Sequence, residues 1–83
     1  MTKLKVIESV ILYFKNNESI IHENCALNEK YLFKNGSYVM IGYYFGTGDG
    51  WLELNGNRCN LTKTELLLIR EVVALNQSKV IYF

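Results

Sequence analysis

The sequence contains no proline, and it has only two cysteines, one histidine and one tryptophan among 83 residues. Without proline, no helix has an obligatory break and no slow prolyl isomerisation is expected. A disulfide between Cys25 and Cys59 is possible in principle. However, two cysteines in a chain without a recognisable secretion signal more often are reduced core residues, and we expect that here.

The chain also has no long apolar run and no excess of charge of either sign. The apolar run 10–14 is too short to span a bilayer, and Glu8 precedes it with no small-residue cleavage site. A formal net charge of +1 gives no broad electrostatic reason to expect nucleic acid, a membrane or an acidic ligand as partner. We therefore expect a cytoplasmic protein that does not bind membranes.

The residues that are present predict one folded domain over 1–83. Hydrophobic residues make up 49% of the chain and charged residues 20%, a composition typical of folded rather than disordered proteins. A chain of this length buries only a small core, so its stability should be modest.

Asn55-Gly56 is the strongest turn signal, because this pair tolerates the positive φ angles of a two-residue type I′ hairpin. That turn would place Leu54 opposite Asn57, Glu53 opposite Arg58, and Leu52 opposite Cys59. The Glu53–Arg58 pair should stabilise this register. Leu52 and Leu54 would then share one face and the charged pair the solvent-facing one.

A helix over 63–75 is the second strong signal. Thr62 and Glu65 have the spacing of a capping box, in which each side chain bonds the main-chain amide of the other residue. At 100° per residue one half of this helix is apolar, and Arg70 lies on the other half. The apolar half consists of Leu66, Leu68, Ile69, Val72, Val73 and Leu75. Leu67 projects from the polar side and is a candidate for partner contact.

The first thirty residues are ambiguous between a hairpin and a helical segment. Residues 3–14 fit both a helical stripe and the alternation of a strand, and their Val, Ile, Tyr and Phe content favours the strand slightly. Residues 15–18 would then form a turn and 19–22 a return strand. Residues 24–30 would be a polar connection with room for a short helical turn.

Residues 31–61 predict an antiparallel meander of three or four strands. Asn35-Gly36 repeats the two-residue hairpin signal and would place Phe33 opposite Tyr38. Gly42 is where we would expect a bulge, and 46–50 is a glycine-rich loop between the hairpins. Residues 62–83 would supply the helix and, over 79–83, a C-terminal edge strand. The fold class is therefore α+β, with a small antiparallel sheet packed on one amphipathic helix.

Three segments together resemble a known family. Residues 51–56 (WLELNG), 61–69 (LTKTELLLI) and 79–81 (KVI) are similar to the front half of an OmpR/PhoB-type winged-helix domain, in which a small sheet runs through a hairpin into such a helix start. The resemblance covers about residues 31–82 and implies a regulator of transcription. The recognition helix and wing would have to follow the equivalent of Ile81, whereas this chain stops at Phe83. No base-reading residue is therefore carried over, and a protein partner is favoured over DNA.

No catalytic, metal or cofactor site is predicted. His22, Cys25 and Cys59 could be three ligands or a thiol with its base, but a structural zinc site needs four ligands and no orienting acid is recognisable. The glycine-rich loop leads into a strand rather than a helix, which argues against a phosphate cradle. Asp49 within it is interpreted as a solvent-facing turn residue.

Aromatic residues are the remaining functional signal. Five of them cluster around one strand and its loop, at Tyr38, Tyr43, Tyr44, Phe45 and Trp51. An exposed aromatic sheet face can anchor a protein partner or stack unpaired bases, although the rings could equally well belong to a small two-sided core. The candidate partner interface is Leu67, Trp51, Tyr43, Tyr44 and Arg70.

We therefore expect a non-catalytic regulatory module that acts in transcription through protein contacts. The alternative is a nucleic-acid-binding domain, either by its aromatic sheet face or as part of a longer winged-helix regulator. A homodimer through the unprotected 79–83 edge is a further possibility, because unpaired strand edges associate.

Overall fold

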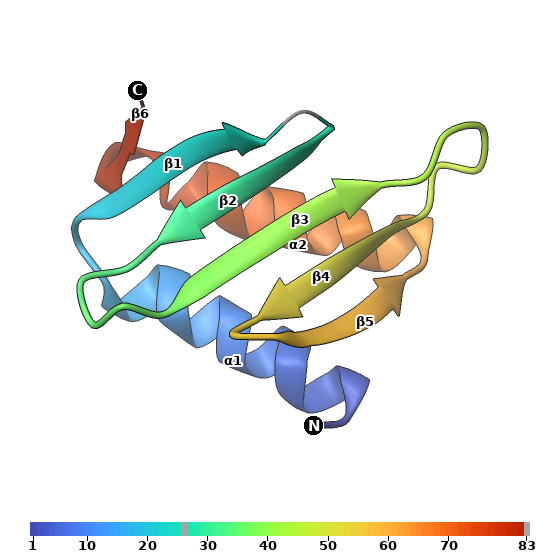
Figure 1. Ribbon diagram of the computed structural model, residues 1–83, viewed down its shortest axis with the longest axis horizontal. Helices are drawn as coiled ribbons and strands as arrows, with labels where there is room; N and C mark the ends of the chain where they lie inside the picture. The colour runs from blue at the N-terminus through green and yellow to red at the C-terminus, as the bar shows by residue number, and fades with distance from the viewer. Residues whose placement is uncertain (26, 83) are drawn as a thin grey trace.

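A computed structural model describes residues 1–25 and 27–82 of the chain, in which two helices lie on one side of a six-stranded sheet (Figure 1). The elements are α1 (Lys3–Asn16), β1 (Ile20–Cys25), β2 (Asn28–Leu32), β3 (Tyr38–Tyr43), β4 (Gly50–Leu54), β5 (Asn57–Leu61), α2 (Lys63–Leu75), the 3₁₀ turn η1 (Gln77–Lys79) and β6 (Val80–Tyr82). The strand order is β5-β4-β3-β2-β1-β6, and all neighbours are antiparallel except β1 and β6. The α+β class is confirmed, and the sheet carries two helices rather than one.

The strand favoured for residues 3–14 is wrong, because this segment forms α1. Thr2 caps the helix by accepting a hydrogen bond from the amide of Lys5. The buried residues of α1 recur at a helical spacing and are Val6, Ile7, Val10 and Phe14. Burial of this stripe against the sheet outweighs the strand preference of its β-branched and aromatic residues.

The first predicted hairpin, between residues 3–14 and 19–22, is wrong, although its second strand exists. The segment predicted as a return strand lies in β1, which pairs with β2 and β6 instead of with residues 3–14. The predicted polar connection 24–30 also differs, since residues 24–25 belong to β1 and residues 28–30 to β2, while residue 26 lies outside the described residues. The polar side chains there do not interrupt the strands, because backbone pairing between β1 and β2 continues through them from Ile21–Leu32 to Cys25–Asn28.

The β4–β5 hairpin follows the predicted register. Asn55 and Gly56 both have positive φ angles, of 49° and 91°, as a type I′ turn requires. All three predicted cross-strand pairs are present, and Arg58 Nε lies 3.0 Å from Glu53 Oε1. Leu52 and Leu54 are buried on the helix side of the sheet.

The β2–β3 connection is one residue longer than predicted. The Gly36 amide donates a hydrogen bond to the Phe33 carbonyl, and the Phe33 amide donates one to the Ser37 carbonyl. Three residues, 34–36, therefore form the loop. Only Gly36 has a positive φ, which is typical of a type I turn followed by a glycine bulge. The predicted Phe33–Tyr38 pair is therefore wrong, and Leu32 lies opposite Tyr38.

Gly42 does not mark a bulge, because it pairs without interruption with Asn28 on one side and Trp51 on the other. A Cβ placed on Gly42 would lie 1.9 Å from Cε2 of the Trp51 indole. The glycine is therefore needed for space, since the indole lies across the strand where a side chain would stand.

The helix predicted over 63–75 is confirmed as α2, with both hydrogen bonds of the Thr62–Glu65 capping box present. Its buried face is narrower than predicted and consists of Leu66, Ile69 and Val73. Leu68 and Leu75 are 46% and 78% exposed. A helix packed on a twisted sheet contacts it along one narrow stripe. Residues at the edges of the predicted apolar half, such as Leu68 and Leu75, therefore remain exposed to solvent.

The predicted C-terminal strand exists as β6 and lies at one edge of the sheet, with β5 at the other. Val80 is buried beside Ile20, its parallel partner on β1. Just before β6, the Lys79 ammonium donates to the Phe14 and Lys15 carbonyls at the end of α1. That contact joins the last turn of one helix to the start of the final strand. Residue 83 lies outside the described residues.

Candidate interaction surface

The sheet has a helix-covered face and an opposite face, which we call the outer face. No helix or strand within residues 1–25 and 27–82 covers the outer face, which is turned toward the viewer in Figure 1. Side chains alternate between the two faces along each strand, so the pairing register of neighbouring strands places the outer-face residues in rows that run across the sheet.

The middle row of the outer face, which we call the charged row, alternates in sign. From β1 to β5 it reads Glu23, Lys30, Met40, Glu53 and Arg58. Met40 on the central strand β3 is its only uncharged member. Opposite charges are adjacent within each half, where they stabilise the pairing of neighbouring strands.

Aromatic rings fix several of these charges in place. The Lys30 ammonium lies 5.0 Å from the Tyr38 ring, and the Tyr38 hydroxyl donates to Glu53 Oε2 at 2.7 Å. The Arg58 guanidinium lies 3.7 Å from the Trp51 ring centre. The Tyr38 hydrogen bond and the Arg58 charge hold the pKa of Glu53 below its ordinary value. The outer face is therefore preorganised around charged side chains with restricted freedom.

A second row of the outer face is apolar and lies toward the β6 edge. Its members are Ile81, Ile21, Leu32 and Tyr38, which are consecutive partners across β6, β1, β2 and β3. Ile81 is 48% exposed and the other three are half-buried. This row forms an apolar strip beside the charged row, and Met40 of the charged row adjoins it on β3.

The five predicted interface residues lie at different places. Trp51 belongs to the outer face but is only 7% exposed, because it is enclosed between Gly42 and Arg58. Tyr43 and Arg70 meet on the helix side of the sheet, and Leu67 lies one turn before Arg70 on α2, 59% exposed. Tyr44 lies just after β3 and donates to Asn60. The structure therefore brings only Tyr43, Arg70 and Leu67 near one another.

A polar cluster that sequence reasoning missed surrounds Glu29 on the helix side. Its carboxylate accepts hydrogen bonds from the Tyr43 hydroxyl at 2.9 Å and the Tyr31 hydroxyl at 3.4 Å, and it forms an ion pair with Arg70 of α2. The buried His22 imidazole lies 3.2 Å away. These residues come from four elements, so only tertiary structure joins them.

The charges in this cluster are matched, and its groups shift one another's protonation. Burial alone would raise the pKa of Glu29, but the Tyr43 hydrogen bond, the Arg70 charge and the His22 contact outweigh it and lower the pKa. Burial and the bond to Glu29 raise the pKa of Tyr43 to about 12. Arg70 comes from α2, whereas Tyr31 and Tyr43 come from the sheet. Because all three donors converge on one carboxylate, the cluster fastens α2 to the sheet.

The residues considered for chemistry are not assembled into a site. His22 and Cys25 lie on opposite faces of β1, and Cys59 lies on β5 with three strands between it and Cys25. Among the described residues no three His, Cys, Asp or Glu side chains are grouped as metal ligands. Asp49 is exposed, as predicted, but its carboxylate also accepts from the Lys63 amide at the first turn of α2.

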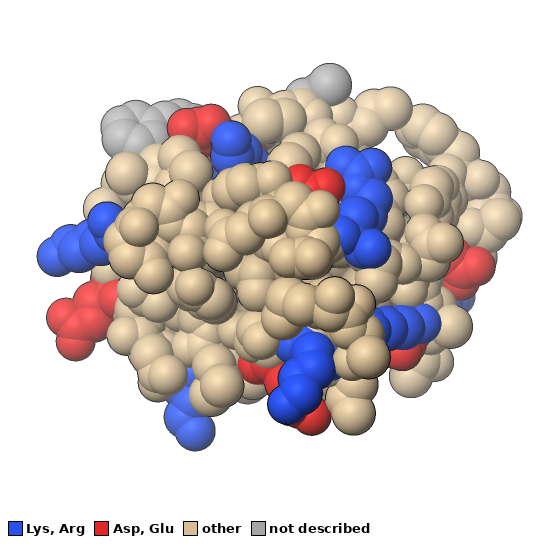
Figure 2. Space-filling view, turned by 60° about the horizontal axis from the view of Figure 1, so that its bottom comes forward, with Lys and Arg blue, Asp and Glu red and all other residues tan. Residues whose placement is uncertain are grey.

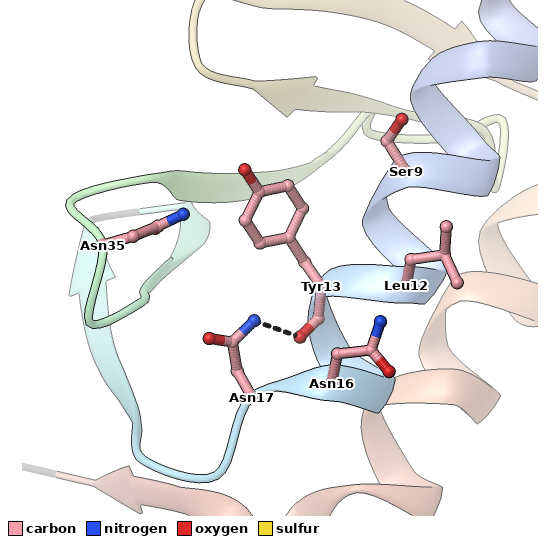
Figure 3. Close-up of a pocket in the computed structure, with 6 residues that line it drawn as sticks. All are labelled: Ser9, Leu12, Tyr13, Asn16, Asn17 and Asn35. Atoms are coloured by element: carbon pink, nitrogen blue, oxygen red, sulfur yellow. Dashed lines mark hydrogen bonds between the residues drawn. The ribbon is translucent and has the colours of Figure 1, made fainter.

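Shallow hollows occur at two places on the surface of residues 1–25 and 27–82. The first, of about 300 Å³, lies between the end of α1 and the β2–β3 loop (Figure 3). It is lined by Ser9, Leu12, Tyr13, Asn16, Asn17 and Asn35. Its lining is neutral, and the Asn17 amide is engaged by the Tyr13 carbonyl. The second, of about 240 Å³, lies beside the α2 N-terminus, where Asp49 already accepts from the first-turn amide.

Charges of both signs are interspersed on the surface. Figure 2 shows basic and acidic side chains side by side on the face in view, with broad uncharged areas between them. The face in view therefore offers no extended positive area to attract a polyanion. No described helix is long and apolar enough to cross a membrane.

Comparisons with known proteins add no relative. No family model, no curated protein and no solved structure matches this chain.

Proposed function

We propose that this protein is a non-catalytic interaction module that acts in transcription regulation through protein–protein contacts, with the outer face of the sheet as its contact surface. The observation that carries the proposal is the one-sided layering, since both helices cover the same face of the sheet. The opposite face exposes an apolar strip and ordered Tyr and Arg side chains, which are residue types enriched at the energetic centres of interfaces.

The regulatory setting is supported by the resemblance of residues 31–82 to the front of an OmpR/PhoB-type domain. The non-catalytic role is supported by the Glu29 cluster, the densest group of titratable side chains noted above. Its hydrogen bonds and ion pair are all directed at Glu29, so its geometry favours stabilising the fold over acting on a substrate.

The second candidate is a nucleic-acid binder that stacks bases on the outer face. It is favoured by the presence of Tyr38 and Trp51 on that face. It is disfavoured because Arg58 already lies on the Trp51 ring and because charges alternate in sign along the charged row. Such a binder would show salt-sensitive retention on single-stranded DNA or RNA, and no retention at low salt would exclude it.

Photo-crosslinking in cells that make the protein tests the proposal. A photoreactive amino acid replaces Met40 at the centre of the outer face, and a control variant carries it at Leu4, which is 64% exposed on α1. We expect protein adducts from position 40 and none of the same size from position 4. Adducts that nuclease removes would favour the second candidate, and no adduct from position 40 would refute a contact role for the outer face.

A further inference from the structure

The charged row has a symmetry that identifies a partner. In order across β1 to β5 its charges are negative, positive, neutral, negative, positive, with Met40 at the centre. Reversing the row about Met40 places every charge opposite one of the other sign. Glu23 then faces Arg58, and Lys30 faces Glu53. The row is therefore complementary to a reversed copy of itself.

From this pattern we infer that the outer face binds a second copy of the same chain, face to face, about a two-fold axis parallel to β3 through Met40. This inference rests on the proposed function, since it names the partner of the same surface. A two-fold interface uses the same patch on both subunits, so residue i contacts j and j contacts i. Each dimer would contain two Lys30–Glu53 contacts and two Glu23–Arg58 contacts.

The same row excludes the other two-fold arrangement. An axis perpendicular to the strands, along the charged row, would place Glu23 against Glu23 and Lys30 against Lys30 of the second copy. Like charges juxtaposed at an interface are strongly unfavourable. The charge pattern thus selects one orientation, with β2 of one copy over β4 of the other. Met40, the one uncharged member, meets its own counterpart at the axis.

The dimensions fit a weak dimer. Stacked sheets lie about 10 Å apart, a gap that long Lys, Arg and Glu side chains from both sides can fill. Aligned sheets also cross at about 30° because each is twisted, which displaces outer strands more than inner ones. The Lys30–Glu53 contacts, one strand from the axis, should therefore be displaced less than the Glu23–Arg58 contacts. The Glu53 side chain is only 13% exposed and is bonded to Tyr38 and Arg58, so Lys30 of the second copy would approach it from its exposed edge. A footprint of about 400 Å² per copy corresponds to a transient interface.

Overall charge does not oppose this association, because the net charge of each copy is only +1. We expect the purified protein to show a concentration-dependent monomer–dimer equilibrium with a dissociation constant on the order of micromolar to tens of micromolar, as weak interfaces do. Sedimentation equilibrium from about 1 to 500 µM in low salt measures it. A strict monomer over this range would overturn the inference.

Charge reversal tests the register. Lys30→Glu places two negative pairs in the homodimer, and Glu53→Lys places two positive pairs. Each variant alone should dimerise at least about tenfold more weakly. Mixed together, they should form a heterodimer about as tight as the wild-type dimer, because every reversed charge then meets an opposite one. Lys5→Glu, an exposed residue of α1, changes the net charge as Lys30→Glu does and should leave dimerisation unchanged.

A second pair of variants covers the risk that Glu53→Lys does not fold, since Glu53 also binds Tyr38 and Arg58. Glu23→Lys and Arg58→Glu should behave in the same way, each weakened alone and restored on mixing. Circular dichroism confirms folding of each variant. Failure of mixing to restore dimers in both sets would overturn the inference, as would a dimer insensitive to all four reversals, the result expected for pairing of β6 edges.

The experiments can refute the self-association and the proposed interaction module independently of each other. If the purified protein stays monomeric while the photoreactive group at position 40 captures a different protein in cells, the self-association is refuted and the interaction module stands. If dimers follow the charge-reversal pattern but no adduct other than the dimer forms, the self-association stands and the contact with a regulatory partner is refuted.

Discussion

At the scale of single residues, Glu29 links α2 to the sheet through its ion pair with Arg70. Its carboxylate accepts from Tyr31 and Tyr43 and pairs with Arg70. Hydrogen bonds to a buried charge contribute more than neutral ones, and leaving their donors unpaired is costly. The network makes the stability of the protein depend on one carboxylate and its protonation.

Glu29→Gln should lower the free energy of unfolding at pH 7 by about 1 to 3 kcal/mol. The folded pKa of Glu29 lies below its ordinary value of 4.5, so the carboxylate's contribution is full above pH 4.5 and disappears as the pH falls through the lower, folded value. Urea denaturation at pH 7 and pH 3 measures this, with exposed Glu71→Gln as the control. A difference between wild type and Glu29→Gln that persists undiminished at pH 3 would contradict the explanation.

The stability of the protein also depends on the close fit between Gly42 and the Trp51 ring. Gly42→Ala should destabilise the protein by about 1 to 3 kcal/mol, because the added Cβ overlaps the indole and must displace it. The fluorescence of Trp51, the only tryptophan, should shift to longer wavelength as the ring moves into water. In a Trp51→Ala background the same glycine substitution should cost much less. Equal costs in both backgrounds would show that the ring is not what excludes a side chain there.

At the scale of elements, the two Asn-Gly turns have the same sequence signal and different geometry. Asn55 is itself at positive φ, and its side chain accepts from the Tyr38 amide on a neighbouring strand and donates to Ser37. Asn35 has an ordinary φ, and its side chain accepts from the nearby Ser37 amide. One asparagine therefore joins two hairpins, whereas the other shapes a single loop.

Asn55→Ala should accordingly lower the free energy of unfolding by about 1 to 2 kcal/mol, because alanine is strained at a positive φ and the hydrogen bonds of the Asn55 side chain are lost. Asn35→Ala should lower the free energy of unfolding by less than about 1 kcal/mol, because the bond from the Ser37 amide to Asn35 is exposed to solvent. Thermal unfolding of both variants in the same buffer compares them directly. Equal losses would mean that the link between the two hairpins adds nothing to stability.

The elements that could be predicted from sequence are those with signals inside a few residues. Thr62 and Glu65 fix the start of α2, and Asn55-Gly56 fixes the β4–β5 register, without help from the rest of the chain. Residues 3–14 could not be assigned, because their apolar pattern fits a helix and a strand and only packing decides between them. The β2–β3 register was wrong by one residue, since the same dipeptide serves two- and three-residue loops.

At the scale of the whole molecule, the interaction surface depends on that register. A one-residue slip in β2 moves Lys30 from the outer face to the core face and destroys the alternation of the charged row. The Glu29 cluster was also beyond sequence reasoning, because His22, Tyr43 and Arg70 meet only once the strands and α2 are assembled. A single sequence contains no local signal for either arrangement.

The closing strand β6 offers a test of the overall layering. Val80 and Ile81 are neighbours on opposite faces of the sheet, one buried against the core and one 48% exposed. Val80→Thr should lower the free energy of unfolding by about 1 to 3 kcal/mol, because it buries a hydroxyl. Ile81→Thr should lower it by less than about 1 kcal/mol. Denaturation at about 1 µM keeps self-association from contributing. A larger loss at position 81 would mean that the two faces are assigned the wrong way round.

The pairing of Ile20 with Val80 also has a consequence for synthesis on the ribosome. These partners are sixty positions apart, so the nascent chain can assemble its meander while one side of β1 still lacks a neighbour. Until Val80 has left the exit tunnel, that bare edge is open to other polypeptides and to chaperones. Strand β1 thus gains its second neighbour only after residues 80–82 have been synthesised.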